Sequence, residues 1–336
     1  GCHKVETPTN DENNSIDILN QSIQTSLNGD EGDIDPLVDL EVTVTIKEIR
    51  ALKKIDDIGK ADFSVVVFIN DEKFKSKVFL NQNYINEPWS ATLNVPDEEE
   101  NVTIKIRLWD WNFGLSGLCD LSDNSALLLS NYDIDLVYSL KTGHWEGDDY
   151  NYPYISWADP SGYGRLNGCD DNSIYEDERD CLIVFDITQN DYDGDNIPYW
   201  VEVNSYHTDP QINDTARDDD GDGVPIEWEF KWGAFRDYDW YSDTWVFVSY
   251  YDPFVWEDHS KFDPDNDGLN NVEEYLTSEW GSDPFRKDIF VELDQMEAGP
   301  NGEQASVFPE LGKELLLDAF DKYNIYLHLD DGSMGG

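Results

Sequence analysis

Apolar and polar residues alternate along several short, β-branched segments between Leu40 and residue 111. These segments are LEVTVTIKEIRAL, ADFSVVVFIN, EKFKSKVFL, WSATLNV and NVTIKIRLWDW, and polar turns separate them. A period of two with polar turns is typical of antiparallel strands that bury one face. The segment CLIVFDIT, residues 181–188, has the pattern of a closing strand. We therefore predict a β-sandwich over residues 39–188, with a long irregular insert between Asp120 and Asp180.

The pattern changes on both sides of this sandwich. Residues 1–38 are polar and end in NGDEGDIDP, which predicts a flexible acidic linker. Residues 287–336 read as a strand (KDIFVELDQM), an amphipathic helix (SVFPELGKELLLDAFDKY) and a second strand (NIYLHLDDGSMGG). That order predicts a βαβ unit that begins an α/β domain. With the acidic segment 189–286 between them, the predicted fold is multidomain and mainly β.

The charge balance narrows the classes of function. The chain has 22 basic and 73 acidic residues, a formal net charge of −51, together with 12 Trp. A chain this rich in aromatic residues can fill hydrophobic cores, and it lacks the basic face that nucleic-acid phosphates require. Carboxylates that are grouped together repel one another unless a divalent cation neutralises them. Charge alone therefore suggests calcium, and adaptation to high salt is the alternative.

Three acidic segments share one template of 12 residues. They are DYDGDNIPYWVE (191–202), DDDGDGVPIEWE (218–229) and DPDNDGLNNVEE (263–274), each with Asp at positions 1, 3 and 5 and Glu at 12. At an acid frequency of 73 in 336, roughly 0.7 such matches are expected by chance, and about 0.05 if Gly is required at position 6. Each segment is also followed by Asp-Pro, at residues 209–210, 252–253 and 283–284. Three ordered matches therefore indicate a repeat.

The spacing suits calcium, which takes six to eight hard oxygen ligands. Alternate carboxylates in a tight loop point at one centre, position 6 turns sharply, and Glu at 12 closes the shell. A solvated acidic face is the alternative. We predict about three or more calcium ions, with side-chain ligands at positions 1, 3, 5 and 12 and a ligand at position 7: Asp191, Asp193, Asp195, Ile197 and Glu202; Asp218, Asp220, Asp222, Val224 and Glu229; Asp263, Asp265, Asp267, Leu269 and Glu274.

These loops depart from the EF-hand, in which an apolar residue occupies position 8. Here the apolar residue is at position 7, and Pro198 and Pro225 occupy position 8 in the first two loops. The loops look more like the DxDGDG loops of thrombospondin type 3 repeats and related bacterial and archaeal surface proteins. That resemblance implies a structural role for calcium, since no Met-rich helices of the kind that sensors expose follow the loops.

The first domain resembles a C2 domain. The segment IDDIGKADFSV looks like the first calcium-binding loop of that family, and LWDWN lies where its third loop places an Asp pair. Asn112 replaces a charged ligand, and the insert is longer than usual. The resemblance implies an antiparallel sandwich and possible additional metal ligands at its tip: Asp56, Asp57, Asp62, Asp110, Asn112 and Asp120.

A third resemblance concerns the order of the segments. Acidic repeats followed by DIFVELDQM, a helix and IYLHLDDGSMGG look like the non-catalytic N-terminal part of secreted bacterial and archaeal zinc-metallopeptidase-like proteins. No HExxH, GxSxG or P-loop motif occurs in the chain, so no catalytic residue is predicted. The aromatic insert, including Trp145 and Trp157, suggests either packing or the stacking of sugars.

The cysteines suggest an oxidising compartment. Cys169 and Cys181 flank a short acidic loop that a disulfide can close, and Cys119 reads as a packed residue. The start, Gly1-Cys2 before a polar segment, resembles a lipoprotein cut near its lipobox, and a boundary beside a free thiol is the alternative. We expect a calcium-stabilised module, extracellular or on the cell surface and without a catalytic site. The alternatives are the N-terminal part of a zinc peptidase and an adhesin for surface glycans or proteins.

Overall fold

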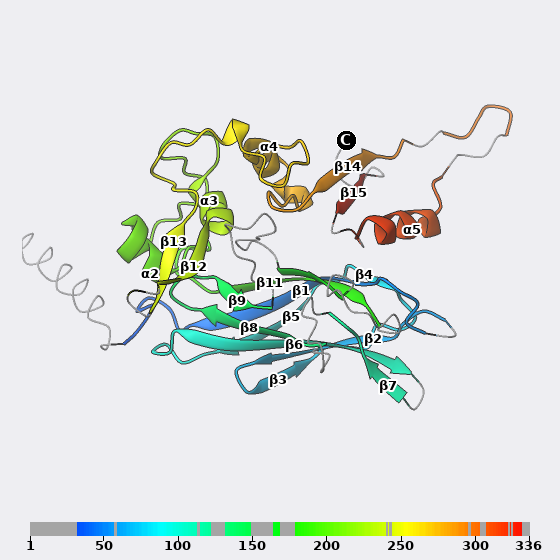
Figure 1. Cartoon of the computed structure of the whole chain (residues 1–336), viewed down its shortest axis with the longest axis horizontal. Coiled ribbons are helices and arrows are strands. Elements are labelled where there is room, and N and C mark those ends of the chain that lie inside the picture. Colours follow the sequence, from blue (N-terminus) through cyan, green and yellow to red (C-terminus); the bar gives the residue numbers. More distant parts are fainter. Residues whose placement is uncertain are drawn as a thin grey trace, which may run out of the picture.

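The computed structural model describes residues 32–56, 59–112, 115–121, 132–148, 164–168, 179–239, 241, 244–294, 297–302, 307–321, 323 and 325–330. The described chain forms a β-sandwich, an array of acidic loops with short helices, and a βαβ unit (Figure 1). This is the mainly β architecture that the sequence predicts. No helix in the described ranges is long and apolar enough to cross a bilayer.

Two antiparallel sheets make the sandwich. The first contains β1 (Glu41–Ala51), β4 (Tyr84–Ile85), β5 (Trp89–Asn94), β10 (Gly164–Asn167) and β11 (Cys181–Gln189). The second contains β2 (Phe63–Ile69), β3 (Glu72–Lys75), β6 (Asn101–Asn112), β7 (Leu115–Leu118), β8 (Ile134–Ser139) and β9 (Trp145–Gly147). In the first sheet β1 pairs with β11 on one side and with β4 and β5 on the other, so the closing strand lies beside the first strand.

The sandwich core follows from the alternation along its strands. Val42, Val44 and Ile46 of β1 are buried, and the residues between them are partly exposed. They belong to the same core cluster as Val65 and Val67 of β2. Side chains that alternate across a strand place one apolar set on one face, and two such faces pack against each other in a sandwich.

The region between Asp120 and Asp180 corrects the prediction of an irregular insert. It supplies β8, which pairs with β6, and β10, which pairs with β11. The segment IDLVYS of β8 alternates buried and partly buried residues, so the strand signal was present in the sequence. The Gly- and Tyr-rich residues around it obscured that signal. Trp145 belongs to β9 and is buried in the sandwich core, which is a packing role.

In the acidic array, helices follow the loops. The short helix α2 (Tyr199–Val201) continues as a π-helical turn, Glu202–Tyr206, after the first loop. Helix α3 (Ile226–Gly233) follows the second loop and α4 (Asn271–Leu276) the third. The first loop is entered from β11 and the third from a 3-10 turn, His259–Lys261. The array is thus built of loop–helix units. The sequences of the loops likewise depart from that of the EF-hand.

The structure adds one element that the sequence patterns did not predict. Strands β12 (Ala234–Asp239) and β13 (Thr244–Ser249) form an antiparallel hairpin between the second and third loops. A further 3-10 turn, Ser278–Trp280, follows α4. The hairpin belongs to the same compact region as α3 in Figure 1.

The last part is the predicted βαβ unit. Strands β14 (Asp288–Glu292) and β15 (Tyr326–Asp330) pair in parallel, and α5 (Glu310–Asp321) connects them. A crossover between parallel strands is normally helical, because the chain must return to the same end of the sheet. Two strands cover little of the helix, and Leu311 and Leu315 remain 64% and 60% exposed.

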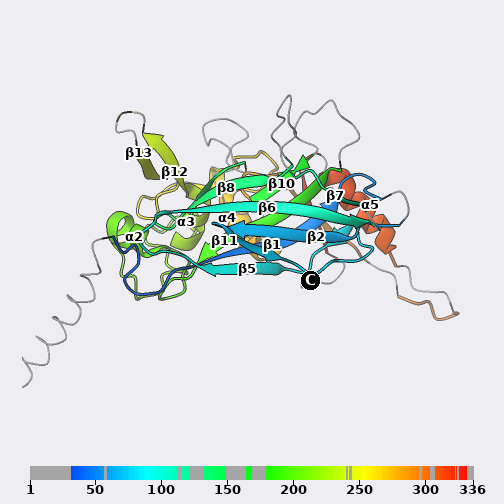
Figure 2. The same ribbon diagram turned by 90° about the horizontal axis from the view of Figure 1, so that it is seen from below.

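The array and the βαβ unit lie on the same side of the sandwich in Figure 1, and the sandwich lies in front of them in Figure 2. The ring of His144, between β8 and β9, stacks on Phe230 of α3 with centroids 4.9 Å apart. At the other end Arg286 donates a hydrogen bond of 2.6 Å to the carbonyl oxygen of Arg165 in β10. Arg165 in turn donates a hydrogen bond of 2.7 Å to Asp321 at the end of α5, so the array and the βαβ unit both contact the sandwich through buried residues.

Candidate metal centres

The backbone of each acidic loop turns at the same two positions. Position 4 (Gly194, Gly221 and Asn266) has φ of 80°, 80° and 60°, and position 6 (Asn196, Gly223 and Gly268) has φ of 66°, 104° and 106°. Only Gly and, less readily, Asn adopt this left-handed conformation at low cost. The requirement at position 6 was predicted from the sequence, and the structure adds the same requirement at position 4.

The carboxylates at positions 1 and 5 accept hydrogen bonds from the loop itself. Asp218 accepts backbone N–H groups from Gly221 at 2.7 Å and from Gly223 at 3.2 Å. Asp222 accepts the N–H of Val224 at 3.2 Å. The other two loops repeat this arrangement through Asp191 and Asp195, and through Asp263 and Asp267. These short-range hydrogen bonds orient the carboxylates inward.

Position 3 behaves differently. Both oxygens of Asp193, and Oδ2 of Asp220 and of Asp265, are buried and receive no hydrogen bond from any described residue. Burial, together with the neighbouring loop carboxylates, raises the pKa of Asp193 to about 6 and that of Asp265 to about 7. The other oxygen of Asp220 and of Asp265 accepts a backbone N–H, at 3.2 and 3.1 Å. A buried carboxylate oxygen without a hydrogen bond is costly, so this position has the properties of a metal ligand.

The three glutamates at position 12 lie beneath the loops. Glu202, Glu229 and Glu274 are each 1% exposed. Burial, together with the nearby loop carboxylates, raises the pKa of each to about 9. The ligand atoms of Asp222 and Glu229 lie close enough together to share one ion, and so do those of Asp195 and Glu202. The structure therefore brings positions 1, 3, 5 and 12 together in one small volume.

These pKa shifts predict how pH affects the metal-free chain. The three glutamates have a folded-state pKa of about 9 against an ordinary 4.5, so the folded state binds more protons than the unfolded state between these values. Stability should therefore be highest near pH 5 and fall as pH rises toward 9. Melting temperatures measured across this range, with and without saturating calcium, check the prediction. A metal-free chain that is equally stable at pH 5 and pH 8 contradicts it.

A fifth acidic residue reaches each loop from farther along the chain. Asp214, Glu257 and Asp288 donate their backbone N–H groups to the position-5 carboxylates Asp195, Asp222 and Asp267, at 3.1, 3.4 and 2.7 Å. The sequence interpretation missed these three residues. Each lies five residues after the Asp of an Asp-Pro pair, in DPQIND, DPFVWE and DPFRKD, so the motif DPxxx[DE] is the signal that identifies them.

Asp214 provides a test of this fifth acid. It is 1% exposed, and its carboxylate groups with those of Asp195 and Glu202. Asp214→Asn keeps the backbone N–H but removes one ligand charge, so calcium should bind the first loop about tenfold more weakly. Asp219→Asn is the matched control, because Asp219 is the other carboxylate that pairs with Arg217. Calcium titration of the two variants gives the comparison, and equal affinities would show that Asp214 does not contribute.

The third loop connects directly to the βαβ unit. Asp288 is the first residue of β14 and is 5% exposed. His328 of β15 contacts its carboxylate through Nε2, and the His328 ring stacks on Phe290 with centroids 4.2 Å apart. His328 is therefore a strand residue that orients an acidic residue, as its predicted strand position suggests.

Position 7 contributes packing. The side chains of Ile197 and Val224 are fully buried in separate hydrophobic clusters, and Leu269 is half-buried. Val224 packs with Trp228, Trp232 and Tyr251. Each loop is thereby held to its helix by an apolar anchor. Ligation by the carbonyl groups at this position remains a prediction.

The tip of the sandwich differs from the loops. Asp110 is fully buried, accepts the N–H of Asp62 at 2.9 Å and lies 3.4 Å from the guanidinium of Arg179. Burial raises the pKa of Asp110, and nearby Asp56 raises it further. Asp62 accepts the N–H of Asn81 at 2.6 Å. The tip carboxylates therefore already have protein partners.

The other predicted tip residues do not extend this group. Asp120 is 3% exposed and forms a β-bridge with Asp180, whose carboxylate pairs with Lys53 at 2.6 Å. Asp57 and the side chain of Asn112 lie outside the described residues. Calcium at the tip remains a prediction from the sequence.

The cysteines correct another expectation. Cys181, predicted to pair with Cys169, is a free, fully buried thiol, and Cys169 lies outside the described residues. Cys181 instead contacts Cys119, which is buried as predicted, and burial raises the pKa of the Cys181 thiol. The two residues are neighbours because Asp120 and Asp180 form the β-bridge next to them. Cys2 and Trp157 also lie outside the described residues, so lipid attachment at Cys2 remains a prediction.

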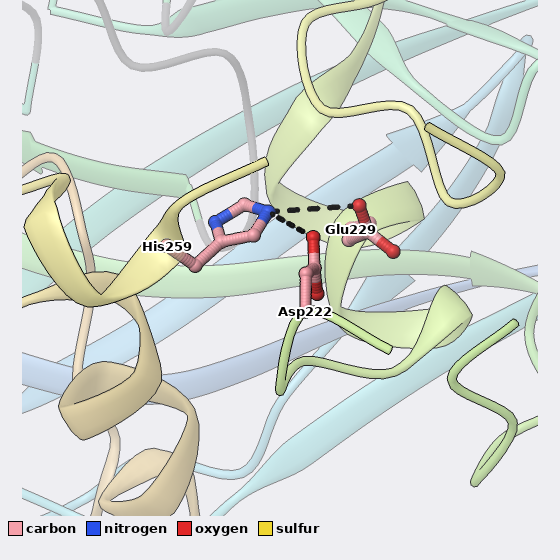
Figure 3. A group of neighbouring side chains, drawn as sticks. All are labelled: Asp222, Glu229 and His259. Atoms are coloured by element: carbon pink, nitrogen blue, oxygen red, sulfur yellow. Dashed lines mark ion pairs between the residues drawn. The ribbon is translucent and has the colours of Figure 1, made fainter. Parts of the chain in front are cut away.

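The middle loop receives a residue of another type. His259, from the 3-10 turn before the third loop, is fully buried, and its Nε2 lies 3.2 Å from Oδ2 of Asp222 and 3.7 Å from Oε1 of Glu229 (Figure 3). The sequence interpretation did not include His259, since no zinc motif surrounds it. Burial lowers its pKa, and the carboxylates of Asp222 and Glu257 oppose that shift.

Comparison with known proteins agrees with this architecture. The C2 domain family model matches residues 40–123, and this part of the chain is a C2 domain, a domain that often binds calcium. Similar solved structures are a structure of a C2 domain (14% identity, 45% of this chain, 98% of the other, TM-score 0.25) and the C2A domain of plant Extended Synaptotagmin 1 (14%, 45%, 95%, TM-score 0.26). A third is human GIVD cytosolic phospholipase A2 (16%, 45% of this chain, 16% of the other, TM-score 0.25). No curated protein matches the chain.

Proposed function

We propose that this chain is a calcium-binding, calcium-stabilised structural module of the extracellular space or cell surface. In this proposal calcium ions in the three acidic loops hold the loop array in shape between the C2 domain and the βαβ unit. The observation that carries the proposal is the repeated set of buried carboxylate oxygens at positions 3 and 12 that accept no hydrogen bond from a described residue. They belong to Asp193, Asp220, Asp265, Glu229 and Glu274.

A structural role is supported by the way each site joins two parts of the chain. The fifth acid comes from a segment beyond the loop's own helix, and in the third loop it is the first residue of β14. An ion bound by both segments excludes conformations in which they separate, and its binding free energy becomes folding free energy. Extracellular calcium modules have dissociation constants of about 10⁻⁴ to 10⁻³ M, and the proposed location outside the cell implies an affinity in this range.

The third loop provides the test of calcium binding. Glu274→Gln removes the charge of the position-12 ligand with little change in shape, and calorimetry should count one calcium site fewer than in the wild type. Glu273→Gln is the matched control on the same helix. Glu273 caps α4 by accepting the N–H of Asn270 at 2.9 Å, and Gln preserves this capping box.

The outcomes separate clearly. If Glu274→Gln and Glu273→Gln bind the same number of calcium ions, the third loop is not a calcium site. If NaCl at an equal concentration displaces all the calcium that the wild type binds, the carboxylates form a solvated acidic face. The proposed function is then wrong.

A further inference from the structure

His259 introduces a nitrogen atom into the middle acidic loop. Its Nε2 lies 3.2, 3.7 and 3.8 Å from carboxylate oxygens of Asp222, Glu229 and Glu257, and it makes no hydrogen bond with a described residue. Neighbouring ligands of one ion at metal–ligand distances of about 2.1 Å lie roughly 3.0 to 3.4 Å apart. Figure 3 shows the imidazole edge and the two carboxylates of Asp222 and Glu229 facing one another. The distances from Nε2 to the carboxylate oxygens are therefore close to those between ligands of one metal ion.

The imidazole is held rigidly in this position. Its ring lies edge-on to Tyr251, Trp228 and Phe262, with centroids 4.9, 5.9 and 5.6 Å apart. The ring is fully buried, so it cannot turn toward solvent. Ligands that are fixed by packing before the ion arrives lose little entropy when it binds, and this favours a tight site.

Asn271 controls which ring nitrogen carries the proton. Its amide nitrogen Nδ2 lies 2.9 Å from Nδ1 of His259, an orientation that leaves the ring proton on Nε2, and its Oδ1 has no hydrogen-bond partner in the described part of the chain. A half-turn of the nearly isosteric amide places Oδ1 on Nδ1, which then donates its proton. The lone pair of Nε2 is left directed at the carboxylates, and this is the usual arrangement for a metal-binding histidine.

The other two loops have no nitrogen at this position. His259 lies two residues after the fifth acid Glu257, and the corresponding residues after Asp214 and Asp288 are Ala216 and Phe290. Neither side chain can bind a metal. In the third loop the imidazole of His328 contacts the carboxylate of Asp288 instead. The middle loop thus combines one imidazole with several carboxylates, whereas the predicted ligands of the first and third loops are all oxygens.

We propose that the middle loop prefers a divalent transition metal ion such as Mn²⁺ over calcium, with Nε2 of His259 as a ligand. The reason is ligand chemistry: calcium takes oxygen ligands, and imidazole together with carboxylates suits first-row transition metals. Asp218, Asp220, Asp222, Glu229 and Glu257 supply the oxygens. This inference rests on the proposed function only in assuming that the loops bind metals. It assigns to the middle loop a different metal preference from that of the first and third loops.

The test uses the full chain, stripped of metal and dialysed against excess calcium with a small amount of Mn²⁺. We expect the wild type to retain one equivalent of Mn²⁺ by elemental analysis, with a ¹⁴N coupling in pulsed EPR. His259→Gln should weaken Mn²⁺ binding at least tenfold and abolish the coupling, since even loss of an outer partner costs about 10- to 100-fold. The first and third loops should keep their calcium.

Two control variants and one second-site variant complete the test. His207→Gln removes an exposed histidine, and His3→Gln removes the histidine beside Gly1 and Cys2, so neither should change the coupling. Asn271→Asp keeps an acceptor for the Nδ1 proton and should bind Mn²⁺, whereas Asn271→Leu should weaken it. Asn271→Leu keeps His259 itself, so this variant still tests the proposal if His259→Gln fails to fold.

Three results would overturn the proposal: no Mn²⁺ retained against calcium, retained Mn²⁺ without ¹⁴N coupling, or equal Mn²⁺ affinity in wild type and His259→Gln. The proposed function fails on a separate result, which is that the first and third loops bind no calcium. This result does not depend on whether the middle loop retains Mn²⁺.

Discussion

Removal of calcium with EGTA should lower the melting temperature of the full chain by on the order of 20 °C, the largest effect we expect. An ion present at 100 times its dissociation constant stabilises by about 2.7 kcal/mol, so three sites contribute about 8 kcal/mol. At about 2 to 4 °C per kcal/mol for a unit of this size, the shift is large. Differential scanning calorimetry with and without the chelator measures it.

The physical reason is the burial of acidic groups. Without an ion, Glu202, Glu229 and Glu274 are buried beside the loop carboxylates, and the mutual repulsion opposes folding near neutral pH. The C2 domain should be affected less, because its core is apolar. Hydrogen exchange should therefore show loss of protection in residues 189–286 before residues 40–123.

The control for the chelation experiment is sodium chloride at matched ionic strength. Screening by salt weakens general repulsion between exposed carboxylates but does not replace a bound divalent ion. If EGTA lowers the melting temperature no more than removal of the same ionic strength does, the stabilising role of calcium is refuted.

Asp321→Asn should destabilise the contact between the βαβ unit and the C2 domain by about 3 to 5 kcal/mol, because it breaks a buried ion network. Asp321, at the end of α5, pairs with Arg50 at 2.6 Å and with Arg165 at 2.7 Å. The three side chains are 2% to 4% exposed. The substitution leaves two buried guanidinium groups short of a counter-charge.

Asp318 provides the matched control on the same helix. Its side chain is 32% exposed and lies 3.4 Å from Arg50, so Asp318→Asn should cost less than about 1 kcal/mol. Urea unfolding of both variants, together with hydrogen exchange of α5 and β15, measures the difference. Equal effects of the two substitutions would mean that burial of this network does not determine how the βαβ unit docks.

The sequence predicted most of the C2 domain and the plan of each loop because both depend on short-range rules. Alternation along β1 identified its buried face, and Asp218 is oriented by N–H groups within five residues of itself. The strand β8 was missed although its residues alternate, because glycine and tyrosine dominate the neighbouring sequence. The predicted Cys169–Cys181 disulfide failed at Cys181 because the fold places that thiol beside Cys119 instead.

By itself, the sequence determined that acidic ligands occur at fixed positions in three loops, since the spacing of a tight turn is local. Only the tertiary structure decided what completes each site. Asp214, Glu257 and Asp288 reach the loops through backbone contacts from distant residues, and His259 reaches the middle loop alone. The network of Arg50, Arg165 and Asp321 likewise joins residues far apart in the chain. Such partners depend on how whole segments pack. The DPxxx[DE] spacing marks the three acids in the sequence, but it does not show which loop each of them reaches.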